Sequence, residues 1–387
     1  MKTRRLSLTG FSGRQPLRAV PQRQSLDWLA DIHAASEATV EGLDPSERDA
    51  FAIQLRRVMD RVACGPSNIA WRATVLSEIG SSDWSKASLY DPTKRPRGAG
   101  TDARNQAFAQ HVSAYFGAEY DEVNTAPRDL IHVTCTGYVA PSGAQQLVAQ
   151  KGWGGQTRVT HAYHMGCYAS LPAARMASGY LLSEPSAGDG PEDRADIVHT
   201  ELCSLHLDPS DHALEQLVVQ SLFADGYTRY SVRASGDYPG LEILALAEEI
   251  LPHSAASMAW SVSDFGMRMR LSREVPDQIA GVLRGFVAEL YLRAELPLAE
   301  TLASTVFAVH PGGPKIIDRV SQVLELAPAQ VQASREVLFE HGNMSSATLP
   351  HIWMRILADD RVPAGTLILS LAFGPGLTIS GGLFRKH

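Results

Sequence analysis

The sequence predicts an α/β protein built from two similar halves. Short apolar runs typical of buried strands alternate with helical patterns along the chain. The second half repeats the character of the first after a Gly- and Pro-containing segment at 233–240. No short-period repeat is present, which excludes solenoids and propellers. We therefore expect one half at residues 1–235 and the other at 236–387.

Composition narrows the class of protein further. Of the 387 residues, 44% are hydrophobic and 20% are charged, as in a globular protein with a large core. The formal net charge of −7 argues against nucleic acid as a partner. The apolar runs at 241–247 and 366–373 are shorter than the ~20 residues that span a bilayer. The first residues lack the apolar stretch of a signal peptide.

The four cysteines are far apart and form no C-x-x-C pair. In a chain of this length, that spacing indicates reduced thiols, with at most one of them reactive. Together with the absence of a signal peptide and a membrane span, it predicts a cytoplasmic protein.

The elements of the first half follow an irregular basic arm. Asp44 and Pro45 mark the start of a helix over 44–64, with Asp44 as its N-cap. Arg57 and Arg61 lie four residues apart on the outer side of this helix, with Arg56 nearby, as a solvated face or as a binding patch. Further along we expect a loop at 91–105, helices at 106–116 and 212–226, and strands at 131–135, 157–166 and 194–207.

The second half opens with two strands inside 257–272. A helix over 274–292 follows, and then a buried strand at 305–313 that breaks on Pro-Gly-Gly. Helices extend through 314–340 and end at Gly342, and two final strands are joined by Gly374-Pro375-Gly376.

Cys167 is the first candidate for chemistry. It follows a strand and Gly166, and it opens a helix rich in Ala and Gly. The unpaired N–H groups and the positive dipole end of a helix N-terminus favour thiolate over thiol, which would make this cysteine a nucleophile. The competing interpretation is a small side chain that fills a gap in the core, which is the commoner role of a buried cysteine.

Two further positions strengthen the case for chemistry. His310 ends a strand directly before Pro311-Gly312-Gly313, and Asn343 lies between the helix-ending Gly342 and a helix of small residues. A cysteine that carries an acyl group needs a partner for its thiolate, and it needs donors aimed at the thioester oxygen. Histidine and asparagine side chains supply both.

Competing sites fit the sequence less well. His161, His164 and Cys167 have a spacing that suggests metal ligands, but the two histidines point to opposite faces of a strand. His199-Thr200-Glu201 lacks the Pro-Cys-x-x-Cys of a zinc deaminase. Hydrolase, phosphate-loop and dinucleotide-binding motifs are absent as well. We therefore expect no metal.

Four motifs together resemble the type III polyketide synthases, the chalcone synthase family of the thiolase superfamily. They are HMGCYASLPAARMA around Cys167, VHPGGPKIIDRV around His310, HGNMSSA around Asn343 and AFGPGLTI near the end. They occur in the family's order, and the resemblance extends from about residue 45 to the C-terminus. The related β-ketoacyl-carrier-protein synthases III usually have Gln-Ala-Asn after the histidine, where this chain has Pro-Gly-Gly, which favours the type III group.

The resemblance implies a five-layered αβαβα thiolase-like fold and a homodimer. It also implies a mechanism in which Cys167 accepts an acyl group from a thioester and His310 with Asn343 stabilises an enolate formed by decarboxylation. Claisen condensation then lengthens the chain, and the resemblance implies a product that is cyclised to an α-pyrone or a related ring. No cofactor is implied, because acyl-coenzyme A or a phosphopantetheine thioester is the substrate.

Other positions are carried over from the family one at a time. Phe223 matches an aromatic gate between the cavity and its tunnel, and Met269 stands at the position of the gate's usual aromatic partner. Ala140 replaces a methionine that crosses the dimer interface of plant members. The positions expected to line the substrate cavity are Cys135, Thr136, Leu205, Val219, Ser345, Gly374 and Pro375.

The basic helix face is incomplete by the same comparison. Arg57 and Arg61 match two of the three basic residues that hold coenzyme A phosphates in plant members, and Gln54 stands at the third position. This thinner clamp suggests that an acyl carrier protein delivers at least one substrate, with Arg56, Arg57 and Arg61 as the contact.

Two alternatives stay open. One is a stand-alone ketosynthase that joins two carrier-bound β-ketoacyl chains into an α-pyrone antibiotic through Cys167. The other is an inactive thiolase-fold subunit that partners an active one. The presence of all three residues of the triad argues against the second alternative.

Overall fold

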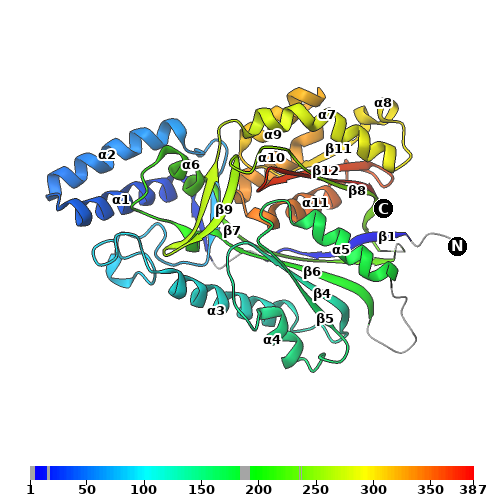
Figure 1. The fold of residues 1–387 in the computed structure, drawn as a ribbon, viewed down its shortest axis with the longest axis horizontal. Coiled ribbons are helices and arrows are strands. Elements are labelled where there is room, and N and C mark those ends of the chain that lie inside the picture. Colours follow the sequence, from blue (N-terminus) through cyan, green and yellow to red (C-terminus); the bar gives the residue numbers. More distant parts are fainter. Residues whose placement is uncertain (1–4, 15–17, 184–191, 235, 237) are drawn as a thin grey trace.

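The computed structural model describes residues 5–14, 18–183, 192–234, 236 and 238–387. A nine-stranded mixed sheet with the order β11-β12-β13-β8-β1-β7-β6-β4-β5 crosses the molecule (Figure 1). Its strands are β1 (Leu6–Ser12), β4 (Pro127–Thr134), β5 (Arg158–Tyr163), β6 (Glu192–Leu202), β7 (Asp225–Ala234), β8 (Gly240–Ile250), β11 (Val306–Val309), β12 (Leu367–Gly374) and β13 (Thr378–Lys386). Two small ribbons pair β2 (Arg18–Pro21) with β3 (Trp71–Thr74) and β9 (Met258–Ser263) with β10 (Gly266–Leu271).

The α-helices flank this sheet. They are α1 (Gln22–Glu41), α2 (Pro45–Val62), α3 (Thr101–Glu119), α4 (Gly143–Gln150), α5 (Ser170–Ser183), α6 (Leu214–Leu222), α7 (Val275–Arg293), α8 (Leu298–Thr301), α9 (Pro314–Leu324), α10 (Gln332–His341) and α11 (Thr348–Ala358). Short 3-10 helices lie at η1 (Trp84–Lys86), η2 (Cys203–His206), η3 (Leu302–Ser304), η4 (Pro328–Val331) and η5 (Ser345–Ala347).

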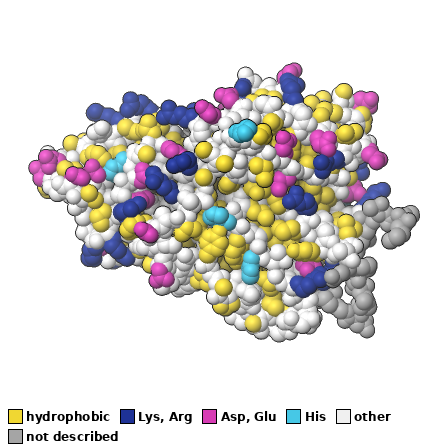
Figure 2. All heavy atoms as spheres, in the orientation of Figure 1, with side chains coloured by type: hydrophobic (Ala, Val, Ile, Leu, Met, Phe, Trp, Pro, Cys, Tyr) yellow, Lys and Arg dark blue, Asp and Glu magenta, His cyan; other side chains and the backbone are white. Residues whose placement is uncertain are grey.

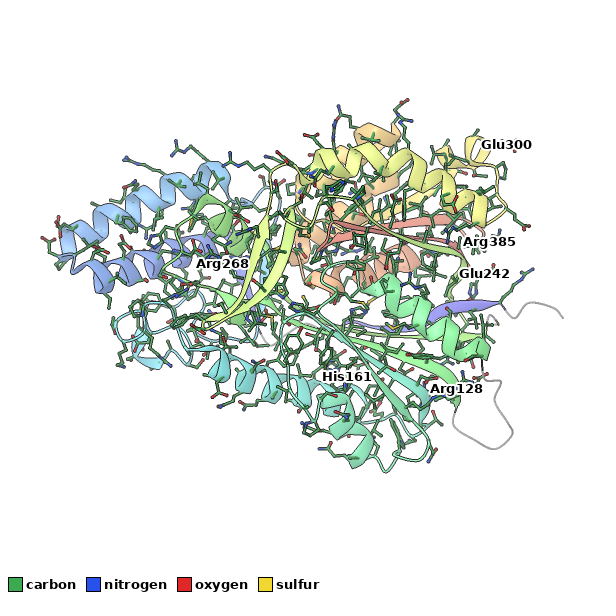
Figure 3. The ribbon with its side chains drawn as sticks, viewed as in Figure 1. Arg128, His161, Glu242, Arg268, Glu300 and Arg385 are labelled. Atoms are coloured by element: carbon green, nitrogen blue, oxygen red, sulfur yellow. The ribbon has the colours of Figure 1, made fainter. Side chains whose placement is uncertain are left out.

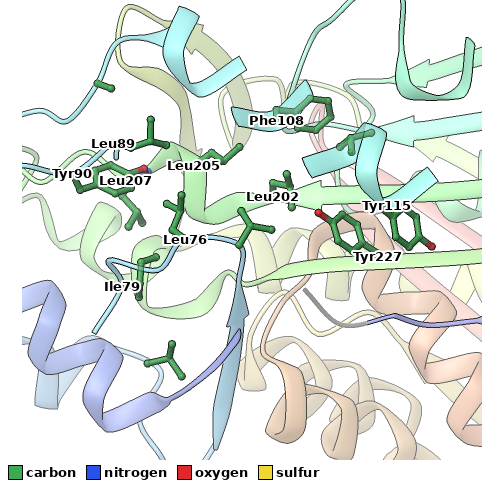
Figure 4. Close-up of a cluster of buried hydrophobic side chains, with 14 of the residues drawn as sticks. Leu76, Ile79, Leu89, Tyr90, Phe108, Tyr115, Leu202, Leu205, Leu207 and Tyr227 are labelled. Atoms are coloured by element: carbon green, nitrogen blue, oxygen red, sulfur yellow. The ribbon is translucent and has the colours of Figure 1, made fainter. Parts of the chain in front are cut away.

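Three hydrophobic clusters define five layers. The first packs α3 and α4 on β4 and β6, and Figure 4 shows part of it, including Phe108, Tyr115 and Leu202. The middle cluster buries α5 and α11 between the part of the sheet that holds β4, β6 and β7 and the part that holds β8, β11 and β12. The third packs α7 and α9 on β12 and β13. The order helix, sheet, helix, sheet, helix is visible from bottom to top in Figure 1.

The two parts of the sheet, β11-β12-β13-β8 and β1-β7-β6-β4-β5, meet where β1 pairs with β8. Leu8 lies opposite Leu241 on β8 and opposite Val232 on β7, so β1 holds both neighbours. The carboxylate of Glu242 pairs with Arg385 of β13 at 3.3 Å (Figure 3) and with Arg5 at 3.4 Å. The seam between the halves is therefore a continuous antiparallel ladder with an ion-paired end.

Much of the expected secondary structure is confirmed. Asp44 caps α2 as predicted, because its side chain accepts from the backbone N–H groups of Ser46 and Glu47, and Glu47 completes the capping box. The hairpin at 257–272, the helix at 274–292 and the final strand pair also lie where the sequence places them.

Other expectations were wrong. The stretch before residue 44 is not irregular, since it holds β1 at the centre of the sheet and the 20-residue helix α1. Helix α3 begins at Thr101 inside the expected loop, and strand β6 ends at Leu202, where η2 begins. Strands β7 and β8 were not recognised, and they occupy the segments on either side of the expected boundary between halves.

Among the described residues, no helix is both long and apolar enough to cross a membrane.

Candidate active site

Cys167 lies in the turn between β5 and α5. His164 and Gly166 adopt left-handed backbone conformations, with φ of 66° and 80°, and the turn that follows leads into α5 at Ser170. The Ala169 N–H donates to the Gly166 carbonyl at 3.1 Å, which closes the turn around Cys167. The strand, glycine and helix expected from the sequence are therefore present, and the cysteine precedes the helix by three residues.

The loop at Gly374, Pro375 and Gly376 packs directly on this turn. A Cβ atom at Gly374 would lie 2.2 Å from Tyr168 Cδ1, and one at Gly166 would lie 2.9 Å from Pro375 Cδ. Both positions need glycine, because any larger side chain overlaps the facing loop. The C-terminal strand pair thus fixes the backbone on either side of Cys167.

Asn343 is held by a short backbone bridge. Its N–H donates to the Leu222 carbonyl at 3.1 Å, and its own carbonyl accepts from the Ala224 N–H at 2.8 Å, so Asn343 pairs with Phe223 in parallel. Gly342, with φ of 71°, turns the chain out of α10 into this bridge. The expected gate residue and the expected catalytic asparagine are therefore neighbours.

The orientation of the Asn343 side chain follows from Ser345. Ser345 has a left-handed backbone, with φ of 49°, and its N–H donates to Asn343 Oδ1 at 2.8 Å. Because that N–H needs an acceptor, Oδ1 faces the turn and the Nδ2 donor faces the other way. Hydrogen bonding by the Asn343 side chain is among the influences that lower the pKa of Cys167.

Cys167 is buried at 8% exposure, and its Sγ lies 3.8 Å from Ser345 Oγ. Burial raises the pKa of Cys167 to about 12, and the hydrogen bonds from Ser345 and Asn343 oppose that rise without cancelling it. The sequence predicts that the helix N-terminus favours the thiolate, whereas burial favours the neutral thiol, because desolvation disfavours the charged form.

His310 ends β11 and is 1% exposed. Its backbone N–H donates to the Leu371 carbonyl at 2.8 Å, which ties it to β12. Within the described chain, neither ring nitrogen has a hydrogen-bond partner, and burial lowers the pKa of His310 to about 3. The imidazole is therefore neutral, with a buried donor and acceptor both unused.

A second polar cluster lies beside the cysteine. Cys135 Sγ is 3.2 Å from Ser345 Oγ, and its backbone N–H donates to Glu201 Oε2 at 3.1 Å. Thr136 Oγ1 donates to the same carboxylate oxygen at 3.1 Å, and Ser346 Oγ donates to Oε1. Burial raises the pKa of Glu201, since hydrogen bonds offset only part of the desolvation.

A cavity of about 50 Å³ lies beside Phe223, the predicted gate residue. Its wall includes Val219, which is predicted to line the substrate cavity, and Met269, the predicted partner of the gate. Leu205 does not, because it is fully buried and packs in the first hydrophobic cluster (Figure 4). Cys135, Thr136, Ser345, Gly374 and Pro375 lie outside this cavity, in the cluster and the loop around Cys167.

Sequence reasoning missed most of the cavity wall, including Cys203, His206, Trp260 and Arg72. Trp260 Nε1 donates to the Cys135 carbonyl at 2.6 Å, and His206 Nε2 bonds the Thr136 carbonyl at 2.8 Å. These two rings therefore join the cavity wall to the loop that follows β4.

The basic face of α2 divides into two kinds of arginine. Arg56 is partly buried and pairs with Asp31 and with Asp27 of α1. Arg57 and Arg61 are exposed, and the Arg61 Nε donates to the Arg57 carbonyl at 3.2 Å. Figure 2 shows basic side chains along the outer edge of α2. Of the three predicted contacts, Arg57 and Arg61 are the ones open to an anionic ligand.

The histidines near Cys167 have separate partners. His161, labelled in Figure 3, bonds Ser142 Oγ at 2.9 Å, whereas His164 Nε2 bonds the Trp260 carbonyl at 2.9 Å. No group of three or more His, Cys, Asp or Glu side chains suited to a metal ion occurs among the described residues.

Comparison with known proteins gives the class first. Solved structures of polyketide synthases share the fold: PKS-I from the brown alga Ectocarpus siliculosus superposes with a TM-score of 0.81 at 20% identity over 100% of both chains. The 1,3,6,8-tetrahydroxynaphthalene synthase of Streptomyces coelicolor A3(2) gives 0.77 at 23% identity over 98% of this chain and 99% of that one. The fold is therefore thiolase-like.

The sequence comparisons give the family. Residues 242–386 match the model of chalcone and stilbene synthases, C-terminal domain. Type III polyketide synthase C of Arabidopsis thaliana is 30% identical over 265 residues, which is 66% of this chain and 67% of that protein. The Streptomyces coelicolor tetrahydroxynaphthalene synthase is 28% identical over 72% of this chain and 74% of its own length.

This chain belongs to the type III polyketide synthases. It is an acyltransferase that condenses acyl thioesters in Claisen fashion, and enzymes of this family take coenzyme A thioesters as substrates.

Proposed function

We propose that Cys167, His310 and Asn343 are the catalytic residues of this polyketide synthase. The observation that carries the proposal is the arrangement around Cys167. The buried Cys167 thiol lies in the turn before α5, 3.8 Å from the hydroxyl of Ser345, whose N–H holds Asn343 Oδ1. The buried imidazole that follows β11 has both ring nitrogens unused among the described residues. Unused buried donors cost free energy unless a ligand satisfies them, which supports a role in binding a reacting oxygen.

The mechanism begins with a neutral thiol and a neutral imidazole. Transfer of the Cys167 proton to His310 gives a thiolate, which attacks the carbonyl of an acyl thioester, and the coenzyme A or carrier thiol leaves. A malonyl thioester then loses CO₂, and its enolate oxygen accepts hydrogen bonds from His310 and Asn343. The enolate carbon attacks the Cys167 thioester, and the thiolate leaves as a chain longer by two carbons forms.

The product is a short polyketide that cyclises to an α-pyrone or a related ring. The family resemblance supports this product, and the side chains around the cavity beside Phe223 are the ones that the chain would meet. Predicted contacts to the chain are Val219, Phe223 and Met269.

The substrate's phosphates bind to the exposed side of α2. Arg57 and Arg61 lack carboxylate partners within the described residues, which leaves their charge free for coenzyme A or for the phosphopantetheine of a carrier protein. Arg56 does not face the ligand in this proposal. It holds α2 against α1 through its ion pairs with Asp27 and Asp31. If a carrier protein delivers the substrate, substitution of Arg57 and Arg61 should weaken the binding of both acyl-coenzyme A and the acyl carrier protein. The unmodified enzyme should react faster with the carrier-bound acyl group than with acyl-coenzyme A.

The homodimer forms along the edge of the sheet at β5. This strand pairs with β4 on one side, and its other side ends the sheet. An unpaired strand edge readily adds a second strand, so a second copy is its natural occupant. The buried, unpaired cysteines support a cytoplasmic location.

The two proposed halves, residues 1–235 and 236–387, repeat one pairing pattern. In the series β1-β7-β6-β4 the pairs are antiparallel, antiparallel and parallel, and the series β8-β13-β12-β11 has the same sequence of pairs. Cys167 lies in the first half, and His310 and Asn343 lie in the second. Neither half alone would then hold the complete site.

Intact-mass spectrometry tests the catalytic assignment. Wild type and Cys167→Ala are incubated with a panel of acyl-coenzyme A and acyl-carrier thioesters, with Cys135→Ala as the matched control. Acyl adducts on wild type and Cys135→Ala, and none on Cys167→Ala, are expected. Equal adducts on Cys167→Ala would exclude it as the nucleophile, and no adduct with any donor would favour the inactive partner subunit.

A further inference from the structure

Arg72 of β3 is a partly buried cation whose hydrogen bonds go to neutral groups. Its Nε donates to Gln22 Oε1 at 2.7 Å, and its Nη1 donates to the carbonyls of Gln220 and Phe223 at 2.7 and 2.8 Å. Among the described residues it forms no ion pair with a carboxylate, and burial lowers the pKa of Arg72 to about 10. Burying an arginine without an ion pair is costly, so its geometry needs an explanation.

The two carbonyls belong to the C-terminal end of α6. This end carries the negative pole of the helix, and unpaired carbonyls there accept from cations. The guanidinium fork thus binds α6 and its capping residue Phe223 to β3. Gln22, which accepts from Arg72, donates in turn to the carbonyls of Cys64 and Ser221 at 2.5 and 2.8 Å. The Arg72 guanidinium is therefore held by Gln22 and by the end of α6, and Gln22 is itself held by two backbone carbonyls.

The same segment holds Asn343. Leu222 accepts from the Asn343 N–H, Ala224 donates to the Asn343 carbonyl, and Phe223 lies between them. Arg72 also packs on the turn before Asn343, since a Cβ atom at Gly342 would lie 3.1 Å from Arg72 Cγ. Arg72 therefore contacts both segments of the bridge. Its guanidinium donates to the Phe223 carbonyl, and its Cγ lies against Gly342, which precedes Asn343.

We infer that Arg72 is a positioning residue. It holds the segment at Phe223 against the turn at Asn343, and it thereby sets the position of the Asn343 side chain relative to Cys167. The inference rests on the proposed roles of Asn343 and Phe223. Lysine cannot replace the arginine, because one ammonium group lacks the planar fork that reaches Gln22 and two carbonyls together. Decarboxylation depends on Asn343, whereas acyl loading depends chiefly on Cys167, so the two steps respond differently.

The test compares Arg72→Met and Arg72→Lys with Arg104→Met. Arg104 is the control, because it is an even more deeply buried arginine that donates to backbone carbonyls, those of Ala99, Leu205 and Leu207, away from the Asn343 bridge. Hydrogen-exchange mass spectrometry follows peptides over 222–226 and 341–347. Both Arg72 variants should speed their exchange about tenfold or more, as the loss of a charged hydrogen bond predicts, and Arg104→Met should not.

A milder variant covers the case in which Arg72→Met does not fold. Gln22→Met removes the Oε1 acceptor and leaves Arg72 with its two carbonyls, so exchange in 341–347 should rise by a smaller factor. Unchanged exchange in this variant and in Arg72→Lys would overturn the inference. Equal acceleration in Arg104→Met would also overturn it, because the effect would then be a general loss of stability.

Two kinetic readouts connect the inference to the reaction. Acyl loading of Cys167 is followed by intact mass, and malonyl decarboxylation by CO₂ release. Arg72→Lys should lose about tenfold in decarboxylation at nearly unchanged loading. Equal loss in both steps overturns the positioning role. If wild-type protein neither loads nor decarboxylates, the proposed function fails, while the exchange experiment still decides whether Arg72 fixes the bridge.

Discussion

Ser345 Oγ lies 3.8 Å from Cys167 Sγ and 3.2 Å from Cys135 Sγ, so one hydroxyl serves two thiols. Its hydrogen bond to Cys167 is the largest influence that lowers the pKa of this thiol against the effect of burial. The Ser345 hydroxyl therefore increases the fraction of Cys167 that is present as thiolate at a given pH.

Ser345→Ala should make Cys167 less reactive. Loss of a hydrogen bond of about 1 kcal/mol lowers the thiolate fraction about fivefold at a fixed pH. We expect alkylation of Cys167 by iodoacetamide at pH 8.5, followed by peptide mass spectrometry in a Cys135→Ala background, to slow by that factor. The background variant alone keeps the hydroxyl and is the control. Alkylation at an unchanged rate would show that the hydroxyl does not stabilise the thiolate.

Glu201→Gln should act in the opposite direction. The Glu201 carboxylate raises the pKa of Cys167 by repulsion, and an amide of the same shape removes that charge. We expect alkylation of Cys167 at pH 8.5 to become a few-fold faster than in the parent protein. Glu192→Gln, on the remote end of β6, is the matched control and should leave the rate unchanged. A slower reaction in Glu201→Gln would contradict this electrostatic account.

The reactivity of Cys167 should rise with pH without a plateau between pH 6 and 10. Burial places the pKa of Cys167 near 12 and that of His310 near 3, so both groups are neutral across this range. A stable thiolate–imidazolium pair would instead give a constant alkylation rate between the two pKa values. Alkylation of Cys167 over this pH range, with free cysteine as the reference, distinguishes the two behaviours.

Gly374→Ala should destabilise the protein by about 1–3 kcal/mol, the usual cost of overpacking a close contact. The added methyl group would lie 2.2 Å from Tyr168 Cδ1, beside the Cys167 turn. Gly179→Ala in α5 is the control, because its Cβ meets nothing within 4 Å and the helix should gain about 0.5–1 kcal/mol. Urea denaturation measures both, and equal stabilities would show that the loop adapts.

Stability should fall on acidification below about pH 6.5. Burial lowers the pKa values of a set of histidines to about 3 or 4, namely His33, His132, His199, His206 and His310. Because these folded-state pKa values are depressed, the unfolded chain binds protons first, and stability is lost from pH 6.5 downwards. Each histidine costs about 1.4 kcal/mol per pH unit in that window.

Urea titrations at pH 7.5 and 5.5 measure this loss. His33→Gln keeps a donor for Gln220 and removes one titrating group, so its stability should depend less steeply on pH than that of the parent. A slope identical to that of the parent would show that His33 is not protonated on unfolding in this range.

The reactive turn was predictable because its signals are local. A strand, a left-handed glycine and a cysteine before a helix of small residues are adjacent in sequence, and the structure keeps them together. The protonation state of Cys167 was not predictable from the same residues. It depends on desolvation by both halves of the chain, which the sequence around one cysteine does not reveal.

The N-terminal elements were missed for a different reason. Helix α1 buries the polar residues Gln22, Ser25, His33 and Ser36, which interrupt its apolar stripe. Strand β1 is buried on both faces, and its inward residues include Ser7 and Thr9. Neither pattern has the apolar periodicity from which a helix or strand is recognised.

The comparison with the family places Leu205 in the cavity wall, and the local backbone explains why it lies elsewhere. Read as a strand, the segment at 203–206 places Cys203 and Leu205 on one face. It is instead the 3-10 helix η2, where residues three apart share a face, so Cys203 and His206 line the cavity and Leu205 joins the core.

The position of β1 also has a consequence for synthesis. This strand ends at Ser12, whereas its partners β7 and β8 begin at Asp225 and Gly240. As the chain leaves the ribosome, β1 has no partner until more than half of the protein has been made, and such distant pairing is slow. Nascent chains should therefore depend on chaperones until β8 emerges, and the last step of folding should be the insertion of β1 between the two halves of the sheet.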